Sequence, residues 1–298
     1  MIPTAPNTVE TLQDGLRRII ASNPSPMTYW GTNTYIVGHN SVVVIDPGPA
    51  DPAHMKAILG ALKPGETISH ILVTHSHLDH SPLAAPLANA TGAPVYAFGN
   101  SNAGRSDIMT KLAKTGLMGG GEGVDHEFAP DELLADGDTI VGDGWKITAL
   151  WTPGHLGNHL CFVWGNSIFT GDHIMGWASS LVSPPDGDLT DFMASTRKLA
   201  KLSPKLYYPA HGAPVLDPAA RIKWLLDHRL NRESAIISAL SRGEADVISL
   251  AKLIYSDTAK TLMPAAERNV LAHLVDLVQK NKVTAQGTLK KDAVFKLL

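Results

Sequence analysis

Cysteine is almost absent from this chain of 298 residues, which contains only Cys161. A single thiol excludes an internal disulfide, and it also excludes a metal site assembled from several thiolates. Any metal ion that the protein binds must therefore be held by histidine, aspartate or glutamate side chains.

Long apolar runs are also missing. No window of about twenty apolar residues is present, and residues 1–20 lack the basic start, the apolar core and the small-residue cleavage site of an export signal. We therefore expect a cytoplasmic protein that does not enter a membrane. The net charge of -3 conceals an excess of Lys and Arg over Asp and Glu in residues 218–298. This mildly basic tail allows contact with nucleic acid, although a solvated helix surface is the simpler interpretation.

Short strands and helices alternate through the first two hundred residues, punctuated by Gly and Pro. We expect strands at 33–38, 42–48, 94–98, 145–152, 159–164, 167–172 and 205–212, another strand ending at residue 74, and helices at 52–62, from 81 onward and at 190–202. The strands at 159–164 and 167–172 should form a hairpin. The stretch that follows the strand at 94–98, up to residue 123, reads as irregular and rich in glycine.

Residues 218–298 are predicted to be mostly helical. Apolar residues recur there at spacings of three and four, which is typical of amphipathic helices. The predicted elements are helices at 222–237, 247–255 and 271–278 and a hairpin within 283–298. Three helices and a hairpin indicate a winged-helix-like domain. We therefore divide the chain into a catalytic domain, residues 1–217, and a C-terminal domain, residues 218–298.

The stretch 75-HSHLDH-80 gathers three histidines and an aspartate directly after a predicted buried strand. Each buried imidazole brings polar nitrogens that need partners, and a metal ion would supply them. In an extended segment His75 and His77 point to the same side, and a following turn lets Asp79 and His80 face a second position. A catalytic zinc keeps one place open for water, so these four residues cannot complete two sites by themselves.

Three further candidates each follow a predicted strand: His155 in 152-TPGH-155, Asp172 in 170-TGD-172, and His211 in 209-PAHG-212. Loops at one rim of a sheet can converge on a single ligand site. We assign the first metal to His75, His77 and His155 and the second to Asp79, His80 and His211, with Asp172 bridging the two.

The ordered pattern H-x-H-x-D-H, P-G-H, G-D and A-H-G resembles the metallo-β-lactamase superfamily over residues 29–212. The resemblance implies an α/β fold, an αββα sandwich with a dinuclear metal site on one edge. It also implies that Asp46, in 42-VVVIDPGP-49, supports the ligands from behind. His173 and His159 each neighbour a ligand without matching a ligand position, so we expect them to support the site or to be structural.

Two divalent ions lower the pKa of a shared water, so the expected enzyme is a metal-dependent hydrolase that uses a metal-bound hydroxide. Asp79 and Asp172 are the predicted catalytic residues, the first orienting the hydroxide or moving its proton and the second fixing the metal separation. Zinc is the first expectation, with iron or manganese as alternatives. In the superfamily that the sequence resembles, a bridging aspartate is found in thioesterases, lactonases and some nucleases but not generally in true β-lactamases. The resemblance therefore implies a substrate other than a β-lactam, and we expect a small ester, thioester or lactone as the acyl substrate.

The tail and residues 173–195 resemble the β-lactamase-like protein 2 group, whose C-terminal domain is a winged helix. Animal members of that group cleave single-stranded RNA and related fungal proteins are thioesterases, so a metal-dependent single-strand endoribonuclease is the alternative function. This resemblance places Trp177, Ser179 and Ser180 in the pocket beside the metals. The tail lacks a dense basic stripe and interleaved aromatic residues, which favours a lid that packs on the catalytic domain over a nucleic-acid surface. The oligomeric state is left open.

Overall fold

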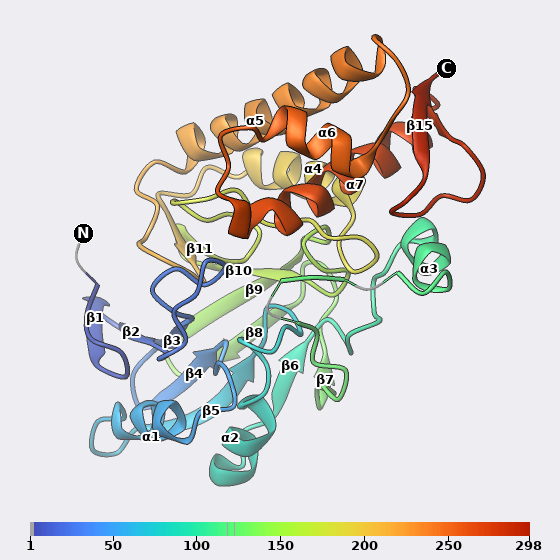
Figure 1. The fold of residues 1–298 in the computed structure, drawn as a ribbon. Helices are drawn as coiled ribbons and strands as arrows, with labels where there is room; N and C mark the ends of the chain where they lie inside the picture. Colours follow the sequence, from blue (N-terminus) through green and yellow to red (C-terminus); the bar gives the residue numbers. More distant parts are fainter. Residues whose placement is uncertain (1–2, 118, 122) are drawn as a thin grey trace.

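The computed structural model describes residues 3–117, 119–121 and 123–298 and places two sheets at its centre, between two groups of helices (Figure 1). The first sheet has seven strands in sequence order, antiparallel from β1 to β4 and parallel from β4 to β7. These strands are β1 Val9–Gln13, β2 Leu16–Ile20, β3 Asn33–Val37, β4 Ser41–Ile45, β5 Thr67–Leu72, β6 Val95–Ala97 and β7 Glu132–Leu133.

The second sheet has five strands in the order β12-β11-β10-β9-β8, with only the β11–β12 pair parallel. Its strands are β8 Thr139–Gly142, β9 Trp145–Trp151, β10 Leu160–Trp164, β11 Ser167–Gly171 and β12 Leu206–Pro209. The antiparallel pairing of β10 with β11 confirms the hairpin predicted from the sequence.

Alternating side chains along β4 explain the layers of the sandwich. Val43 and Ile45 join the core between the two sheets, while Val42 and Val44 join a second core under the outer helices. The outer helices are α1 Pro52–Gly60 and α2 Ala84–Thr91 on the first sheet, and α4 Leu189–Ala200 and the start of α5 Pro218–Leu240 on the second. The predicted αββα sandwich is confirmed.

The C-terminal unit is built around the far end of α5. Its other elements are β13 Ala245–Asp246, α6 Val247–Ile254, the 3₁₀ helix η1 Lys260–Leu262, α7 Met263–Gln279, β14 Val283–Ala285 and β15 Val294–Leu297. The three strands pair in the order β13-β15-β14, and the antiparallel β14–β15 pair confirms the predicted terminal hairpin. None of the described helices is long and apolar enough to cross a lipid bilayer.

Helix α3, Asp107–Ala113, lies in the stretch that the sequence indicates as irregular. Ser106 caps it by accepting a hydrogen bond from the Met109 N–H. Met109 and Leu112 are buried in the same apolar cluster as residues of α5, α6 and α7, and Figure 1 shows α3 beside the C-terminal unit. The core of the C-terminal unit therefore includes side chains from the first half of the chain.

Strands β1 and β2 precede residue 29 and have no counterpart in the prediction. The pair Arg17–Arg18 interrupts the apolar run of β2, yet both side chains are buried. Arg17 pairs with Glu66 at 2.7 Å, and Arg18 pairs with Glu10 and donates to the Gly212 carbonyl oxygen at 3.0 Å. Charge pairing lets an arginine-bearing strand occupy the interior.

Candidate metal centre

The predicted ligands follow the carboxyl ends of four strands. The stretch 75–80 follows β5, His155 follows β9, Asp172 follows β11 directly and His211 follows β12. The structure brings all seven side chains together in two buried groups, and within each group the possible ligand atoms lie within 4.8 Å of one another. The groups are His75, His77, His155 and Asp172, and Asp79, His80 and His211.

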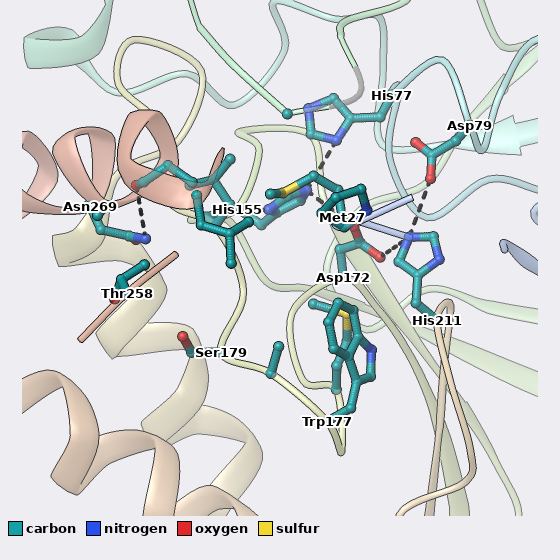
Figure 2. A pocket seen from close by; sticks show the side chains of 18 of the residues that line it. Met27, His77, Asp79, His155, Asp172, Trp177, Ser179, His211, Thr258 and Asn269 are labelled. Carbon is teal, nitrogen blue, oxygen red and sulfur yellow. Dashed lines mark hydrogen bonds and ion pairs between the residues drawn. The ribbon is translucent and has the colours of Figure 1, made fainter. Parts of the chain in front are cut away.

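Three imidazole nitrogens converge in the first group. His75 Nε2 and His155 Nε2 each lie 3.0 Å from His77 Nδ1. Figure 2 shows His77 and His155 turned toward each other next to Asp172.

The second group is arranged around the Asp79 carboxylate. Its Oδ2 atom lies 3.2 Å from His80 Nε2 and 3.2 Å from His211 Nε2. Thr32 Oγ1 donates a hydrogen bond to the same oxygen at 3.1 Å, which fixes the carboxylate plane.

Asp172 faces both groups with different oxygens. Its Oδ2 atom lies 3.5 Å from His155 Nε2 in the first group, and its Oδ1 atom lies 3.2 Å from His211 Nε2 in the second. The carboxylate therefore stands between two sets of nitrogen and oxygen ligand atoms, as a bridging residue would.

The outer hydrogen bonds of the histidines decide which ring nitrogen faces the centre. His155 Nδ1 donates to the Leu181 carbonyl oxygen at 2.7 Å, and His211 Nδ1 donates to the Gly31 carbonyl oxygen at 3.2 Å. A carbonyl oxygen only accepts, so Nδ1 carries a proton in both rings and Nε2 is the nitrogen that faces the centre.

Asp46 orients two more rings from behind. Its carboxylate accepts hydrogen bonds from the Thr74 N–H and hydroxyl, both at 2.7 Å, and from His80 Nδ1 at 3.0 Å. Because the Thr74 hydroxyl donates to Asp46, it can accept from His75 Nδ1, 3.0 Å away. The structure thus places Asp46 where the sequence resemblance expects it.

The buried donor atoms fit divalent cations. In the first group, lone pairs on His75 Nε2 and His155 Nε2 both face His77 Nδ1, which can satisfy one of them at most. In the second group, His80 Nε2 is buried without a hydrogen-bond partner among the described residues. Nitrogen and carboxylate oxygen donors of this kind suit zinc, iron or manganese.

The histidines of the two groups differ in pKa. Burial lowers the pKa of His77 to about 3, so this ring is neutral and able to bind a metal. Burial would also lower the pKa of His211, but the Asp172 and Asp79 carboxylates raise it to about 10. The protons held next to these carboxylates compete with a cation, so metal binding releases protons and weakens as the pH falls.

His159 and His173 lie behind the two groups and belong to neither. His159 Nδ1 is 2.9 Å from Thr152 Oγ1, and its ring centroid is 5.2 Å from that of His75. His173 Nε2 is 3.0 Å from Thr196 Oγ1. Both rings are fully buried and support the packing under the first group.

A cavity of about 220 Å³ opens onto the two groups. Trp177 and Ser179 line it, as the sequence resemblance expects, and Figure 2 shows both below the cluster of ligands. Ser180 lies elsewhere: it is buried behind Asp172, and its hydroxyl donates to the Asp172 and His173 carbonyl oxygens.

Several contributors to the site leave no sequence signal. The Gly31 and Leu181 carbonyl oxygens orient ligands through their backbones, which any residue provides. The opposite wall of the cavity comes from the C-terminal unit, which supplies Tyr255, Thr258, Leu262, Ala265, Ala266 and Asn269. Only Thr32 had a visible clue, because it directly precedes a predicted strand.

A model of the metallo-beta-lactamase superfamily matches residues 27–211, and the chain belongs to this superfamily, whose members are hydrolases. A model of the beta-lactamase associated winged helix domain matches residues 247–291. The C-terminal unit is therefore a winged-helix domain, as the sequence predicts.

The chain is 29% identical to the beta-lactamase-like protein 2 homolog of Drosophila melanogaster, over 92% of this chain and 91% of that protein. It is 30% identical to an atrochrysone carboxyl ACP thioesterase of Aspergillus terreus, over 87% of this chain and 73% of that protein. The crystal structure of a metallo-beta-lactamase family protein from Thermus thermophilus has the same fold, with a TM-score of 0.77, 22% identity and coverage of 97% of this chain and 100% of that one.

Proposed function

We propose that this protein is a dinuclear-metal hydrolase of a small ester, thioester or lactone. The supporting observation is the meeting of seven buried side chains from four loops in two groups, with Asp172 presenting one oxygen to each. The residues proposed to hold the two ions are His75, His77 and His155 for one, Asp79, His80 and His211 for the other, and Asp172 for both. Zinc is the proposed metal, with iron or manganese as alternatives.

When bound, such a metal pair supplies hydroxide at neutral pH and stabilises negative charge on a substrate oxygen. The protein contributes orientation and proton transfer. Thr32 holds Asp79 Oδ2, which leaves Asp79 Oδ1 without a partner among the described residues. We propose that Oδ1 accepts the proton of the attacking water and passes it toward the leaving group.

An acyl substrate fits the cavity better than RNA does. Apart from the proposed ligands, the residues that line the cavity in the described chain include no Lys, Arg, Asp or Glu. RNA binding depends on cationic side chains that neutralise phosphates. The relative from Aspergillus terreus named as a thioesterase supports the same substrate class.

A panel of acyl thioesters, esters, lactones, a β-lactam and single-stranded RNA, assayed with metal-analysed protein, tests the proposal. We expect turnover of at least one acyl substrate, with little response to added salt. An Asp79→Asn variant with the same metal content should lose about 100-fold or more in kcat. Cleavage of RNA alone, weakening steeply as salt is added, would show that the ribonuclease alternative is correct.

A further inference from the structure

The cavity beside the metal centre lies between the catalytic domain and the winged-helix domain. His77, Asp79, His155, Asp172 and His211 form one end. Figure 2 shows Thr258 and Asn269 at the opposite end, with Ser179 and Trp177 along the space between. A molecule that places its reactive carbonyl among the proposed ligands must therefore extend toward the winged-helix domain.

Apolar side chains from both domains form the walls of this space. The catalytic domain contributes Met27, Met175 and Leu181. The winged-helix domain contributes Leu262, from the end of η1, and Ala265, from the first turn of α7. Burying apolar surface here is favourable, whereas a charged group would lose its hydration without finding an opposite charge.

Hydrogen bonds through Asn269 hold the winged-helix wall in position, one of them from the catalytic domain. Asn269 Oδ1 accepts from Arg229 Nη1 at 2.9 Å and from the Val182 N–H at 3.3 Å, and Asn269 Nδ2 donates to the Ala265 carbonyl oxygen at 3.2 Å. Leu181, next to Val182, is the residue whose carbonyl oxygen orients His155. The position of α7 is thus fixed relative to the proposed metal ligands. Its side chains therefore set how far a bound group can extend from them.

The cavity has a volume of about 220 Å³, and the side chains at its far end decide how far a bound group can extend. The alanines at 265 and 266 keep the far part of the space open, since any larger side chain there would occupy it.

We propose that the winged-helix domain selects the substrate by its acyl group, with Leu262 and Ala265 as specificity-determining residues for an apolar acyl group. This inference rests on the proposed acyl hydrolase function. Water adds to the acyl carbon, the bond to the leaving sulfur or oxygen breaks, and that atom leaves as a thiol or alcohol with one proton from the water. The acyl group is released as a carboxylate, and the second proton of the water passes to the solvent.

The test compares acyl thioesters with chains of two to twelve carbons on one common thiol. Ala265→Leu should shorten the cavity and lower the ratio of kcat/KM for the eight-carbon to the two-carbon substrate by about tenfold or more. Leu262→Ala should enlarge the cavity and move the preferred chain length upward. Ala90→Leu makes the first substitution at an exposed alanine of α2, away from the cavity, and should leave the ratio as in the wild type.

A binding measurement separates selection from loss of fold. Calorimetric titration of the metal-loaded wild type with carboxylate products should show affinity rising about fourfold per methylene until the chain reaches Leu262 and Ala265, and then levelling off. In Ala265→Leu the levelling should come at a shorter chain.

The outcomes are distinguishable. If the wild type hydrolyses thioesters but its length profile matches those of Ala265→Leu and Leu262→Ala at equal metal content, the inference about the winged-helix domain is wrong and the proposed function stands. If the metal-loaded wild type hydrolyses no acyl substrate, the proposed function is wrong and this inference is wrong with it.

Discussion

Asp172 must be positioned with respect to both ligand groups, because each of its two oxygens faces a histidine of a different group. Replacing it with alanine removes one carboxylate oxygen from each of the two proposed metal positions. We expect Asp172→Ala to lower the metal content from about two ions per chain toward one and to remove most turnover. Elemental analysis measures the metal content, and steady-state kinetics measures the turnover. Asp14→Ala, at a fully exposed aspartate, is the matched control, and an unchanged metal content in Asp172→Ala would rule out the bridge.

Cys161 gives a second prediction at this scale. The thiol is fully buried in β10, and burial raises its pKa to about 12. Because the thiolate is the reactive form, the folded protein should not react with a thiol-specific disulfide reagent at pH 8, and one thiol per chain should react after unfolding in guanidinium. Rapid labelling of the native protein would contradict the buried position. The expected inertness also means that such a reagent can report thioester hydrolysis without background from the enzyme.

The sequence predicts the candidate ligand side chains better than it predicts the groups that orient them. Histidine and aspartate are informative because few other roles explain a cluster such as 75-HSHLDH-80. The oxygens that fix His155 and His211 belong to the backbones of Leu181 and Gly31, and a backbone carbonyl has no residue type. Their positions depend on tertiary structure alone.

At the scale of elements, α5 connects the two halves of the molecule. Arg229, near its middle, is buried without a carboxylate partner among the described residues, and burial lowers its pKa to about 10. Its guanidinium donates to the Ser180 carbonyl oxygen and to Asn269. Ser180 in turn donates to the Asp172 carbonyl oxygen, so one helix supports the loop that follows β11.

We expect Arg229→Met to lower the free energy of unfolding by about 1 to 3 kcal/mol, because buried acceptors lose their donor. Urea unfolding of metal-loaded protein measures the change. Lys223→Met removes a cation from the same helix at an exposed position and should change stability little. Equal effects of the two substitutions would show that the hydrogen bonds of Arg229 contribute nothing.

Prediction of elements succeeded where the hydrophobic pattern was regular. The β10–β11 hairpin and the helices α4, α5 and α7 follow clear periodicity. β2 was not predicted because Arg17 and Arg18 occupy buried positions. Their partners Glu66 and Glu10 lie outside this strand, so the charge pairing that makes these positions tolerable depends on the fold. α3 was not predicted because its apolar side chains Met109 and Leu112 pack against residues more than a hundred positions later in the chain.

At the scale of the whole molecule, the two ligand groups place unpaired polar atoms in the interior, so metal binding should stabilise the fold. A ligand that binds only the folded state adds about 4 kcal/mol at a thousandfold excess over its Kd. Chelation should therefore lower the Tm by several degrees, and added zinc should restore it. The double variant His77→Ala/His211→Ala should show neither response. A chelator effect as large in that variant would place the stabilising metal elsewhere.

The insertion of α3 into the C-terminal core bears on how this chain can be divided or recombined. A fragment that ends near residue 217 would leave Met109 and Leu112 facing water, and an isolated tail would lack part of its own interior. An exchange of C-terminal segments between relatives should therefore carry the 106–117 segment along with residues 218–298. A graft of residues 218–298 alone would place one protein's C-terminal core against the α3 side chains of another, and the two would not match.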